Sequence, residues 1–396
     1  MPSKPSSKQP ASPALKTVAS EPSWVIRNKN VEFALTRRGG HLAPVTFYRD
    51  SDAPVQPYHV APWAGEKNTR SNIGANEQVL SLLRGDFLCV PFAGGKFNGK
   101  GTPAHGETAS CDWTFGSLVQ DGGKTTLDVT MNMNVPAGRV TKTLAIVDGQ
   151  NVVYNTHTLE GFNATLPISH HATLRMPDEE RCVNVSTSPF SLGLTFHCDT
   201  GSPAIGDYST ILPRQTFTSL TKVPTVYKSP AFDDFSTFPR FRGFCDLLGV
   251  FHKASSKPAW TTAVYTKEGF MWFSLKDAAV LPCLSFWAEH KGRWSSPWLG
   301  RNNCLGLEDG MTYLPSGTEM SVAANPASRA GFATAMKLSP KTPTAIRYIQ
   351  GVAKVPKGFD RVKTASFGKN EVIFTATCGK KIAVPVNWDY LFTGEL

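Results

Sequence analysis

Strict alternation of apolar and polar residues constrains the fold of this chain more than any other feature of its sequence. From residue 127 to residue 135, every odd position is apolar and every even position is polar. This pattern is typical of a β-strand with one face on a core and the other in water. Similar segments at 140–147 and 152–159 follow at once, and the Asp148-Gly149 pair between them suits the positive φ angles of a tight hairpin. The sequence therefore predicts an antiparallel meander.

Short strand-like segments recur through the rest of the chain, and helical periodicity is nearly absent. Residues 264–266, 270–275, 284–287 and 304–307 are examples, separated by Gly, Pro and Asp. Residues 76–83 form two helical turns at most. With 33 Gly, 29 Pro and no visible internal repeat, the sequence does not suit a propeller or a β-helix. We predict an all-β, antiparallel architecture of two large sheets packed face to face.

The chain divides into three segments by composition. Residues 1–22 are rich in Pro, Ser, Lys and Ala, have almost nothing to bury, and are expected to form a flexible tail. Residues 23–340 hold most of the strand-like segments and form the predicted sandwich. A Pro-containing linker at 337–343 then leads to residues 341–396, which we expect to be a β-rich C-terminal extension. This extension either packs on the sandwich or forms a small separate unit.

Charge and composition argue against several classes of protein. Hydrophobic residues make up 41% of the 396 residues and charged residues 18%, which is ordinary for a folded globular chain. Of the net charge of +10, residues 1–22 carry two and residues 341–396 carry five, so only three remain for the rest. Without a concentrated basic stripe or a known binding motif, we expect no nucleic-acid partner. No run of 18 apolar residues occurs, so we expect no membrane partner and a cytoplasmic location.

Eight cysteines are scattered along the chain without a C-x-x-C pair or a tight cluster. Thiolate ligation of a metal usually shows such spacing, so no metal site is expected. Most of the cysteines adjoin apolar residues, as Cys89 does beside Leu88 and Val90, and we interpret them as reduced core thiols. We expect the protein to be a monomer or a homodimer.

Glu308 is the sharpest candidate for a chemical role. It ends the apolar run 304–307 and precedes a predicted turn at Asp309-Gly310. A carboxylate at a core position is costly unless it is paired, and a turn at the end of a sheet is a place where a cleft can open. Glu308 is therefore a candidate general base, and the alternative is a surface glutamate that begins a turn.

Three histidines are candidate acids or ligands. His170 and His171 are neighbours in an extended segment, so their side chains point to opposite faces and cannot both line one site. Which of them faces a cleft depends on a register that the sequence leaves open. His105 lies among the turn formers of residues 99–106 and is expected on a loop, where binding residues concentrate. The alternatives are a structural strand histidine and a solvated loop histidine.

These residues belong to a series of motifs that resembles a known family. A glycine-rich opening at residues 39–45, the His105-Gly106 pair, a Leu-Pro segment ending at His171, and Leu305-Gly306-Leu307-Glu308 follow one another along the chain. Their order and separations resemble those of the aldose 1-epimerase (galactose mutarotase-like) family. The resemblance covers roughly residues 30–340.

The resemblance implies a β-supersandwich that binds a monosaccharide in a cleft, without a metal or an organic cofactor. It also implies that Glu308 takes the proton of the anomeric hydroxyl, that His171 protonates the ring oxygen, and that His105 holds that oxygen or a neighbouring hydroxyl. A positioned acid–base pair of this kind contributes about 10²–10⁴-fold. We expect the carboxylate to keep His171 protonated near neutral pH. The family's arginine before the His-Gly loop has no clear counterpart here.

Further residues are assigned to substrate binding in three roles. Aromatic rings can stack on the apolar face of a pyranose, and cations can clamp a phosphorylated sugar. Neighbours of the catalytic candidates complete the set. The aromatic candidates are Trp113 and Trp298. The candidate cations are Arg175 and Arg301, with Arg181 and Lys100 as further cations. The neighbours of the catalytic candidates are His170 and Asp309.

Three functions from different classes fit the sequence. The first, which we favour, is an aldose 1-epimerase-like isomerase that acts on a free or phosphorylated sugar. The second is a non-catalytic carbohydrate-binding protein, since a fold does not fix a function. The third is a glycan lyase or hydrolase, in which Glu107 or Asp309 would join Glu308 as a second carboxylate.

Overall fold

The predicted meander lies at one side of the largest sheet. The computed structural model of the chain describes residues 12–196, 203–314 and 317–396. In it, β9 (Lys124–Asn134), β10 (Ala137–Val147) and β11 (Val152–Glu160) pair antiparallel in sequence order. Along β9, Leu127 and Val129 are buried, while Asp128 between them is partly exposed. The alternation of the sequence therefore predicted this part of the fold correctly.

Within the described residues, the largest sheet has nine strands and takes one of them from the C-terminal segment. Strand β27 (Thr344–Lys354) pairs with β11 on one side and with β23 (Phe270–Lys276) on the other. The boundary predicted at residue 340 is therefore wrong, because residues 341–396 supply a central strand of the main sheet. Beyond β23, the sheet continues with β22 (Ala259–Tyr265), then β15 (Val183–Thr187), and ends at β20 (Thr237–Phe238). Beyond β9, it ends at β8 (Thr114–Asp121).

The second large sheet has eight strands in the part of the chain that the structure describes. Its central strands are β24 (Cys283–His290) and β25 (Asn303–Met311), which pair antiparallel. The other side of β25 pairs with β13 (Ile168–His170) and then with β14 (Ala172–Arg175). The remaining strands are β21 (Phe244–Phe251), β16 (Leu192–Phe196) and β17 (Thr216–Phe217) beyond β24, and β5 (Leu88–Cys89) beyond β13.

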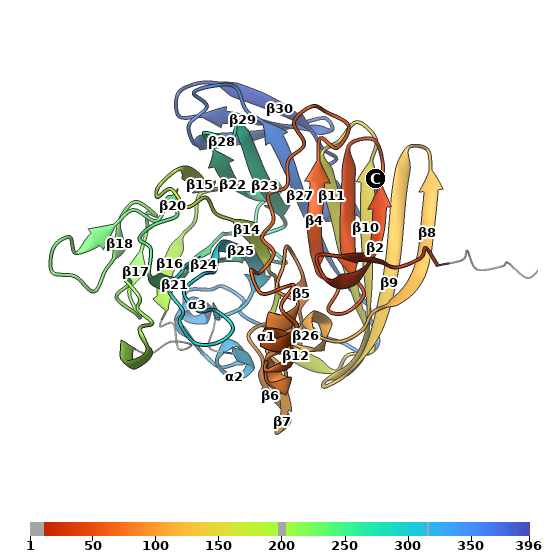
Figure 1. Cartoon of the computed structure of the whole chain (residues 1–396), viewed down its shortest axis with the longest axis horizontal. Helices are drawn as coiled ribbons and strands as arrows, with labels where there is room; N and C mark the ends of the chain where they lie inside the picture. Colours follow the sequence, from red (N-terminus) through yellow and green to blue (C-terminus); the bar gives the residue numbers. More distant parts are fainter. Residues whose placement is uncertain (1–11, 197–202, 315–316) are drawn as a thin grey trace, which may run out of the picture.

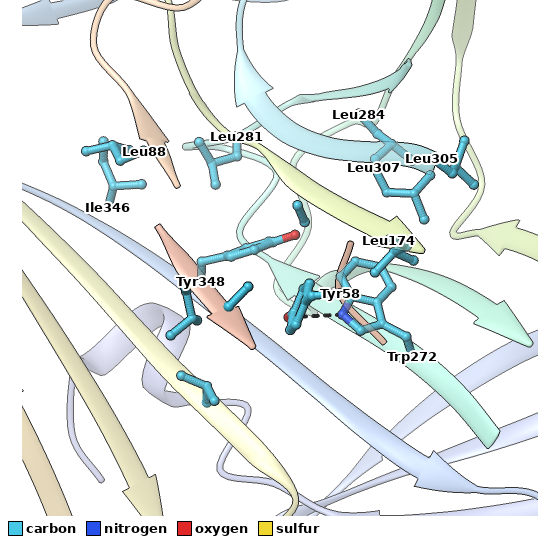
Figure 2. Packing of buried hydrophobic residues seen from close by; sticks show 14 of the residues in the cluster. Tyr58, Leu88, Leu174, Trp272, Leu281, Leu284, Leu305, Leu307, Ile346 and Tyr348 are labelled. Atoms are coloured by element: carbon cyan, nitrogen blue, oxygen red, sulfur yellow. Dashed lines mark hydrogen bonds between the residues drawn. The ribbon is translucent and has the colours of Figure 1, made fainter. Parts of the chain in front are cut away.

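An apolar core fills the space between the two large sheets. Figure 2 shows Leu284 and Leu305 from the eight-stranded sheet in one cluster with Trp272 and Tyr348 from the nine-stranded sheet. All four side chains are fully buried. The indole Nε1 of Trp272 donates to the hydroxyl of Tyr58 at 3.1 Å, so a polar atom in this core is paired. The predicted all-β, face-to-face architecture is confirmed.

Each large sheet also buries part of its outer face. On the nine-stranded sheet, β28 (Val362–Gly368), β29 (Glu371–Ala376), β30 (Lys381–Pro385) and α4 (Tyr390–Thr393) cover a second apolar cluster. Figure 1 shows this three-stranded sheet at the top of the molecule. On the eight-stranded sheet, side chains from the segment 61–109 cover a third cluster that includes Phe87 and Trp287. This third cluster surrounds a cavity.

The N-terminal segment becomes ordered earlier than predicted. Strand β1 (Lys16–Val18) pairs with β2 (Glu21–Arg27), and the sheet continues through β3 (Val31–Thr36) and β4 (Leu42–Phe47). The prediction of a flexible tail is therefore wrong from residue 16 onward, and residues 1–11 lie outside the described part of the chain.

The other elements are short. The paired strands are β6 (Gly95–Phe97) with β7 (Lys100–Thr102), β12 (Ala164–Leu166) with β26 (Met336–Leu338), and β18 (Val223–Pro224) with β19 (Phe232–Asp233). The helices are α1 (Lys67–Ser71), η1 (Ala75–Ser81), η2 (Glu107–Ala109), η3 (Pro203–Ile205), α2 (Gly317–Val322) and α3 (Pro326–Arg329). Within the described ranges, no helix has the length and apolar character needed to cross a bilayer.

An ion pair buried between the sheets gives a first prediction. The Nζ of Lys276 lies 2.6 Å from Oδ1 of Asp309, and both side chains are almost inaccessible. The Oδ2 of Asp309 accepts hydrogen bonds from Ser274 and Tyr348, each at 2.9 Å. Lys276→Met would leave a buried carboxylate without its cation, so we expect the free energy of unfolding in urea to fall by roughly 3–5 kcal/mol.

The control for this prediction removes both charges. The double variant Lys276→Met/Asp309→Leu should recover most of the lost stability, because two apolar side chains need no charge partner. A single variant as stable as the wild type would contradict the structural role of the pair.

Candidate active site

A cavity of about 490 Å³ opens on the outer face of the eight-stranded sheet. Its size falls within the range of small-molecule sites, about 300–1,000 Å³. The sheet contributes Glu308, His171 and Trp287, while the segments 77–93 and 293–298 contribute much of the walls. Most of the lining side chains are apolar, so the few polar ones stand out as candidates for chemistry.

Strand β25 presents Glu308 to this cavity. Side chains alternate along a strand, so Leu305, Leu307 and Asp309 point into the core between the sheets while Glu308 points the other way. The neighbouring position on the cavity face is Gly306. A Cβ there would lie 2.5 Å from Oε1 of Glu308, so the glycine leaves room for the carboxyl group.

His171 lies between β13 and β14 and also faces the cavity. Its ring stacks on Phe87 with 4.5 Å between the ring centroids, and its Nδ1 lies 3.1 Å from the hydroxyl of Thr173. That hydroxyl donates its own proton to the His171 carbonyl at 3.3 Å, so its oxygen is the acceptor for a proton on Nδ1. In the neutral ring, Nε2 is then the nitrogen that can accept a proton.

His105 reaches the same cavity from a turn, as expected for a loop residue. Its φ is +60°, and Gly106 after it has a φ of +79°. Only glycine fits at position 106, because a Cβ there would lie 1.8 Å from the carbonyl oxygen of Val90. The His105 ring packs edge-on against His171 at 4.9 Å, and its buried Nδ1 has no hydrogen-bond partner among the described residues. Burial, helped by the charge of Arg293, lowers the pKa of His105 to about 4.

Glu308 and His171 lie side by side. Oε1 of the glutamate is 3.2 Å from Nε2 of the histidine, and no described residue makes a hydrogen bond of good geometry to that oxygen. Burial raises the pKa of Glu308 well above its usual value, and Arg293 partly opposes this shift. Burial also lowers the pKa of His171 well below 6.5, and His105 adds to the effect. These shifts run against the expectation of a lasting imidazolium, because desolvation favours the neutral form of both groups, so the pair carries one titratable proton.

Arg293 brings positive charge to the cavity, and the sequence reasoning missed it. Oε1 of Glu289 accepts the backbone N–H groups of Gly292 and Arg293 at 2.7 and 3.2 Å, and its Oε2 lies 3.4 Å from Arg293 Nε. The guanidinium lies over the rings of Trp298 and Trp287, at 4.7 and 5.5 Å from their centroids. The spacing of four residues between Glu289 and Arg293 was visible in the sequence. It did not indicate that the turn folds over a cavity.

Two predicted site residues face the inter-sheet core instead of the cavity. His170 is fully buried, and its Nδ1 lies 2.9 Å from Oδ2 of Asp86. Asp309 points the same way, toward Lys276. Strand β25 continues to Met311, so the turn predicted after Glu308 is absent. Each of these two residues is next in sequence to a residue that lines the cavity. Because side chains alternate along a strand, the side chains of His170 and Asp309 point away from the cavity.

Three other predicted binding residues also lie outside the cavity. Trp113 is buried in the inter-sheet core cluster. Arg175 and Arg301 are held in ion pairs away from the lining, with Glu268 and Glu66 respectively. Of the two tryptophans, Trp298 does line the cavity.

The paired carboxylates considered for a hydrolase do not meet. The carboxylate of Glu107 accepts the backbone N–H groups of Asn134 and Val135, at 3.0 and 2.9 Å, and so supports the turn after β9. Asp309 faces the core. Of the further cations considered, Arg181 pairs with Asp233.

No group of three or more His, Cys, Asp or Glu side chains in the described ranges is arranged to hold a metal ion. Cys89, Cys245, Cys283 and Cys304 are buried, as expected for core cysteines. Cys111 and Cys378 are exposed, which the interpretation as core thiols did not anticipate. Cys198 lies outside the described residues.

Comparison with solved structures identifies the fold. A galactose mutarotase-like protein from Clostridium acetobutylicum superposes with a TM-score of 0.57 and 10% identity, over 86% of this chain and 98% of that one. A galactose mutarotase related enzyme from Lactobacillus acidophilus gives a TM-score of 0.51 and 9% identity, over 84% of this chain and 98% of that one. The chain therefore has the galactose mutarotase-like fold, as the resemblance implied. No protein-family model and no curated protein sequence matches it.

The burial of the cavity histidines gives a second prediction. In an NMR titration, we expect His105 to take up a proton only near pH 4 and His171 only well below 6.5. The unfolded chain should titrate near 6.5 and serves as the control. Since the unfolded chain then binds protons first, acidification below pH 6.5 should destabilise the fold. A midpoint at 6.5 for either histidine in the folded protein would contradict this account.

Proposed function

We propose that the protein is a carbohydrate isomerase of the aldose 1-epimerase type, with Glu308 and His171 as its acid–base pair. The observation that carries the proposal is the 3.2 Å approach of a buried carboxyl oxygen, which lacks a hydrogen-bond partner among the described residues, to a histidine nitrogen in a cavity. Buried polar atoms are normally paired, so such an atom in a cavity suits a ligand. The galactose mutarotase-like fold supports the same class of function.

The reaction requires two proton transfers. Glu308 as a carboxylate accepts the proton of the anomeric hydroxyl, and Nε2 of His171 gives its proton to the ring oxygen. The bond between the anomeric carbon and the ring oxygen breaks, and the anomeric carbon becomes an aldehyde carbonyl. Rotation about the adjacent carbon–carbon bond turns the other face of the carbonyl to the ring hydroxyl, and the reverse transfers close the ring. The pair begins and ends with one shared proton, so it needs no external acid or base.

Thr173 and Phe87 preorganise this chemistry. The threonine oxygen accepts the Nδ1 proton of His171, which leaves Nε2 to exchange protons with the substrate. Phe87 stacks on the histidine ring and on the other side stacks on His41, at 4.0 Å, so the imidazole plane is held in place. A fixed ring loses little entropy when the substrate binds.

Charge in the cavity favours a free sugar over a phosphorylated one. Arg293 already lies 3.4 Å from a carboxyl oxygen of Glu289, so a phosphate dianion would compete with that group for the only strong cation in the described part of the lining. Arg175 and Arg301, the cations first considered for a phosphate clamp, are engaged by carboxylates outside the cavity.

Glu308→Gln tests the proposed base. Glutamine keeps the shape of the protonated side chain but cannot accept the proton, so we expect the rate of anomer interconversion to fall by at least about 100-fold while sugar binding stays within a few fold. NMR of freshly dissolved α-glucose and α-galactose measures the rate, and the line broadening measures binding. Glu268→Gln, a surface carboxamide variant, is the control. Binding by a wild type that never accelerates interconversion would instead favour a non-catalytic carbohydrate-binding protein.

The charge of Arg293 predicts the direction of a pH effect. This cation lowers the pKa of both Glu308 and His171, although burial is the larger cause at each. In Arg293→Met both pKa values should rise, so both limbs of the profile of kcat/KM against pH should move to higher pH. Arg301→Met, which removes a surface-paired arginine, should leave the profile in place. A shift of either limb to lower pH in Arg293→Met would show that Arg293 does not act on the pair in this way.

A further inference from the structure

A belt of aliphatic side chains lines part of the cavity. This aliphatic belt consists of Val79, Leu80, Leu83, Leu247 and Leu314. Along the segment that carries three of them, Glu77 is exposed and Leu80 is half-buried, whereas Val79 and Leu83 are only 2% and 3% exposed. Four of the five side chains of the belt are therefore buried and Leu80 is half-buried, and none of them can form a hydrogen bond.

The polar side chains of the cavity are separated into two groups. The buried group surrounds the proposed acid–base pair and consists of Glu308, His171 and Arg293, together with the half-buried His105. The other group is exposed at the mouth and consists of Glu77, Ser295 and Ser296. A ligand whose anomeric carbon lies at Glu308 thus meets polar groups at its reacting end.

Hydrogen-bond satisfaction limits what can lie against the aliphatic belt. Each sugar hydroxyl has one donor and two acceptor positions, and a buried hydroxyl without a partner is unfavourable. The hydroxyls of a hexose are spread around its ring, and the buried polar group can pair only those near the reacting end. A part of the ligand that lies along Val79 and Leu83 must therefore be apolar.

We propose that the substrate of this site is a sugar that carries an apolar substituent, such as an acyl chain, at the end remote from its anomeric carbon. The proposal rests on the proposed function, because it places the anomeric carbon at Glu308. The substituent lies along the aliphatic belt and removes that surface from water. The pairing of Arg293 with Glu289 fits a neutral ligand of this kind.

Calorimetry with two sugars tests the proposal on the full chain. The probes are glucose and 6-O-butanoylglucose, which both keep a free anomeric hydroxyl. Each buried CH₂ should tighten binding about fourfold, so we expect the acylated sugar to bind at least about tenfold more tightly. Leu80→Asn should remove most of this gain, so that the ratio of the two affinities falls toward one. Leu299→Asn is the matched control, because Leu299 is 51% exposed and lies outside the cavity lining. Leu80→Ala replaces the asparagine variant if circular dichroism shows that the latter fails to fold.

The outcomes separate this inference from the proposed function. Equal affinities for the two sugars, or a gain that survives substitution of Leu80, would overturn the inference. Anomer interconversion measured on both sugars tests the function independently. Interconversion without a preference for the acylated sugar leaves the function standing and overturns the inference, whereas tighter binding without interconversion supports the apolar subsite and contradicts the isomerase. Binding of neither sugar overturns both.

Discussion

The register of β25 is the constraint on which the site depends. One residue of this strand, Asp309, is held between the sheets by Lys276, Ser274 and Tyr348. Because side chains alternate, that anchor turns Glu308 to the outer face and leaves Gly306 beside it as open space. A slip of one residue would bury Glu308 among apolar side chains and expose Asp309 to the cavity. The inter-sheet ion pair therefore fixes the position of a proposed catalytic group that it does not touch.

Burial determines the protonation states of the side chains that line the cavity. Glu308, His171 and His105 all lie where charge is unfavourable, so each has a pKa shifted toward its neutral form. The only strong cation that lines the described part of the cavity is Arg293, and Glu289 neutralises it only in part near pH 7, because burial raises the pKa of Glu289 to about 7. Arg293 is thus the one strong charge in the described part of the lining, and it already lies 3.4 Å from a carboxyl oxygen of Glu289. The cavity suits a neutral hydroxylated ligand and a reaction in which a proton moves between groups without leaving the site.

The sequence predicted the parts of this structure that follow from local periodicity. Alternation predicted the meander of β9, β10 and β11, and the motifs selected Glu308, His171 and His105, which the fold brings to one cavity. The errors share a physical cause. His170 and Asp309 were assigned by adjacency in the sequence, although adjacent residues of a strand face opposite ways. The role of β27 was missed because its place in the sheet depends on long-range pairing with β11 and β23, which the Pro-containing linker obscured.

Long-range partners explain the remaining differences. Arg175 and Arg301 looked available for a ligand, but their carboxylate partners lie 93 and 235 positions away in the sequence. Arg293 was overlooked because only the folded turn shows that its guanidinium packs on Trp298. In each case the sequence showed a side chain capable of binding, and tertiary pairing decided whether it was engaged elsewhere or placed in the cavity.

The most direct test of the central claim is a crystal structure of the Glu308→Gln variant with a reducing sugar bound. The account predicts that the anomeric oxygen lies about 2.6–3.2 Å from the carboxamide at position 308 and that the ring oxygen lies at a similar distance from Nε2 of His171. A sugar bound with its anomeric carbon at the mouth of the cavity, or with a non-reacting hydroxyl between these two side chains, would contradict the assignment of Glu308 and His171 as the acid–base pair.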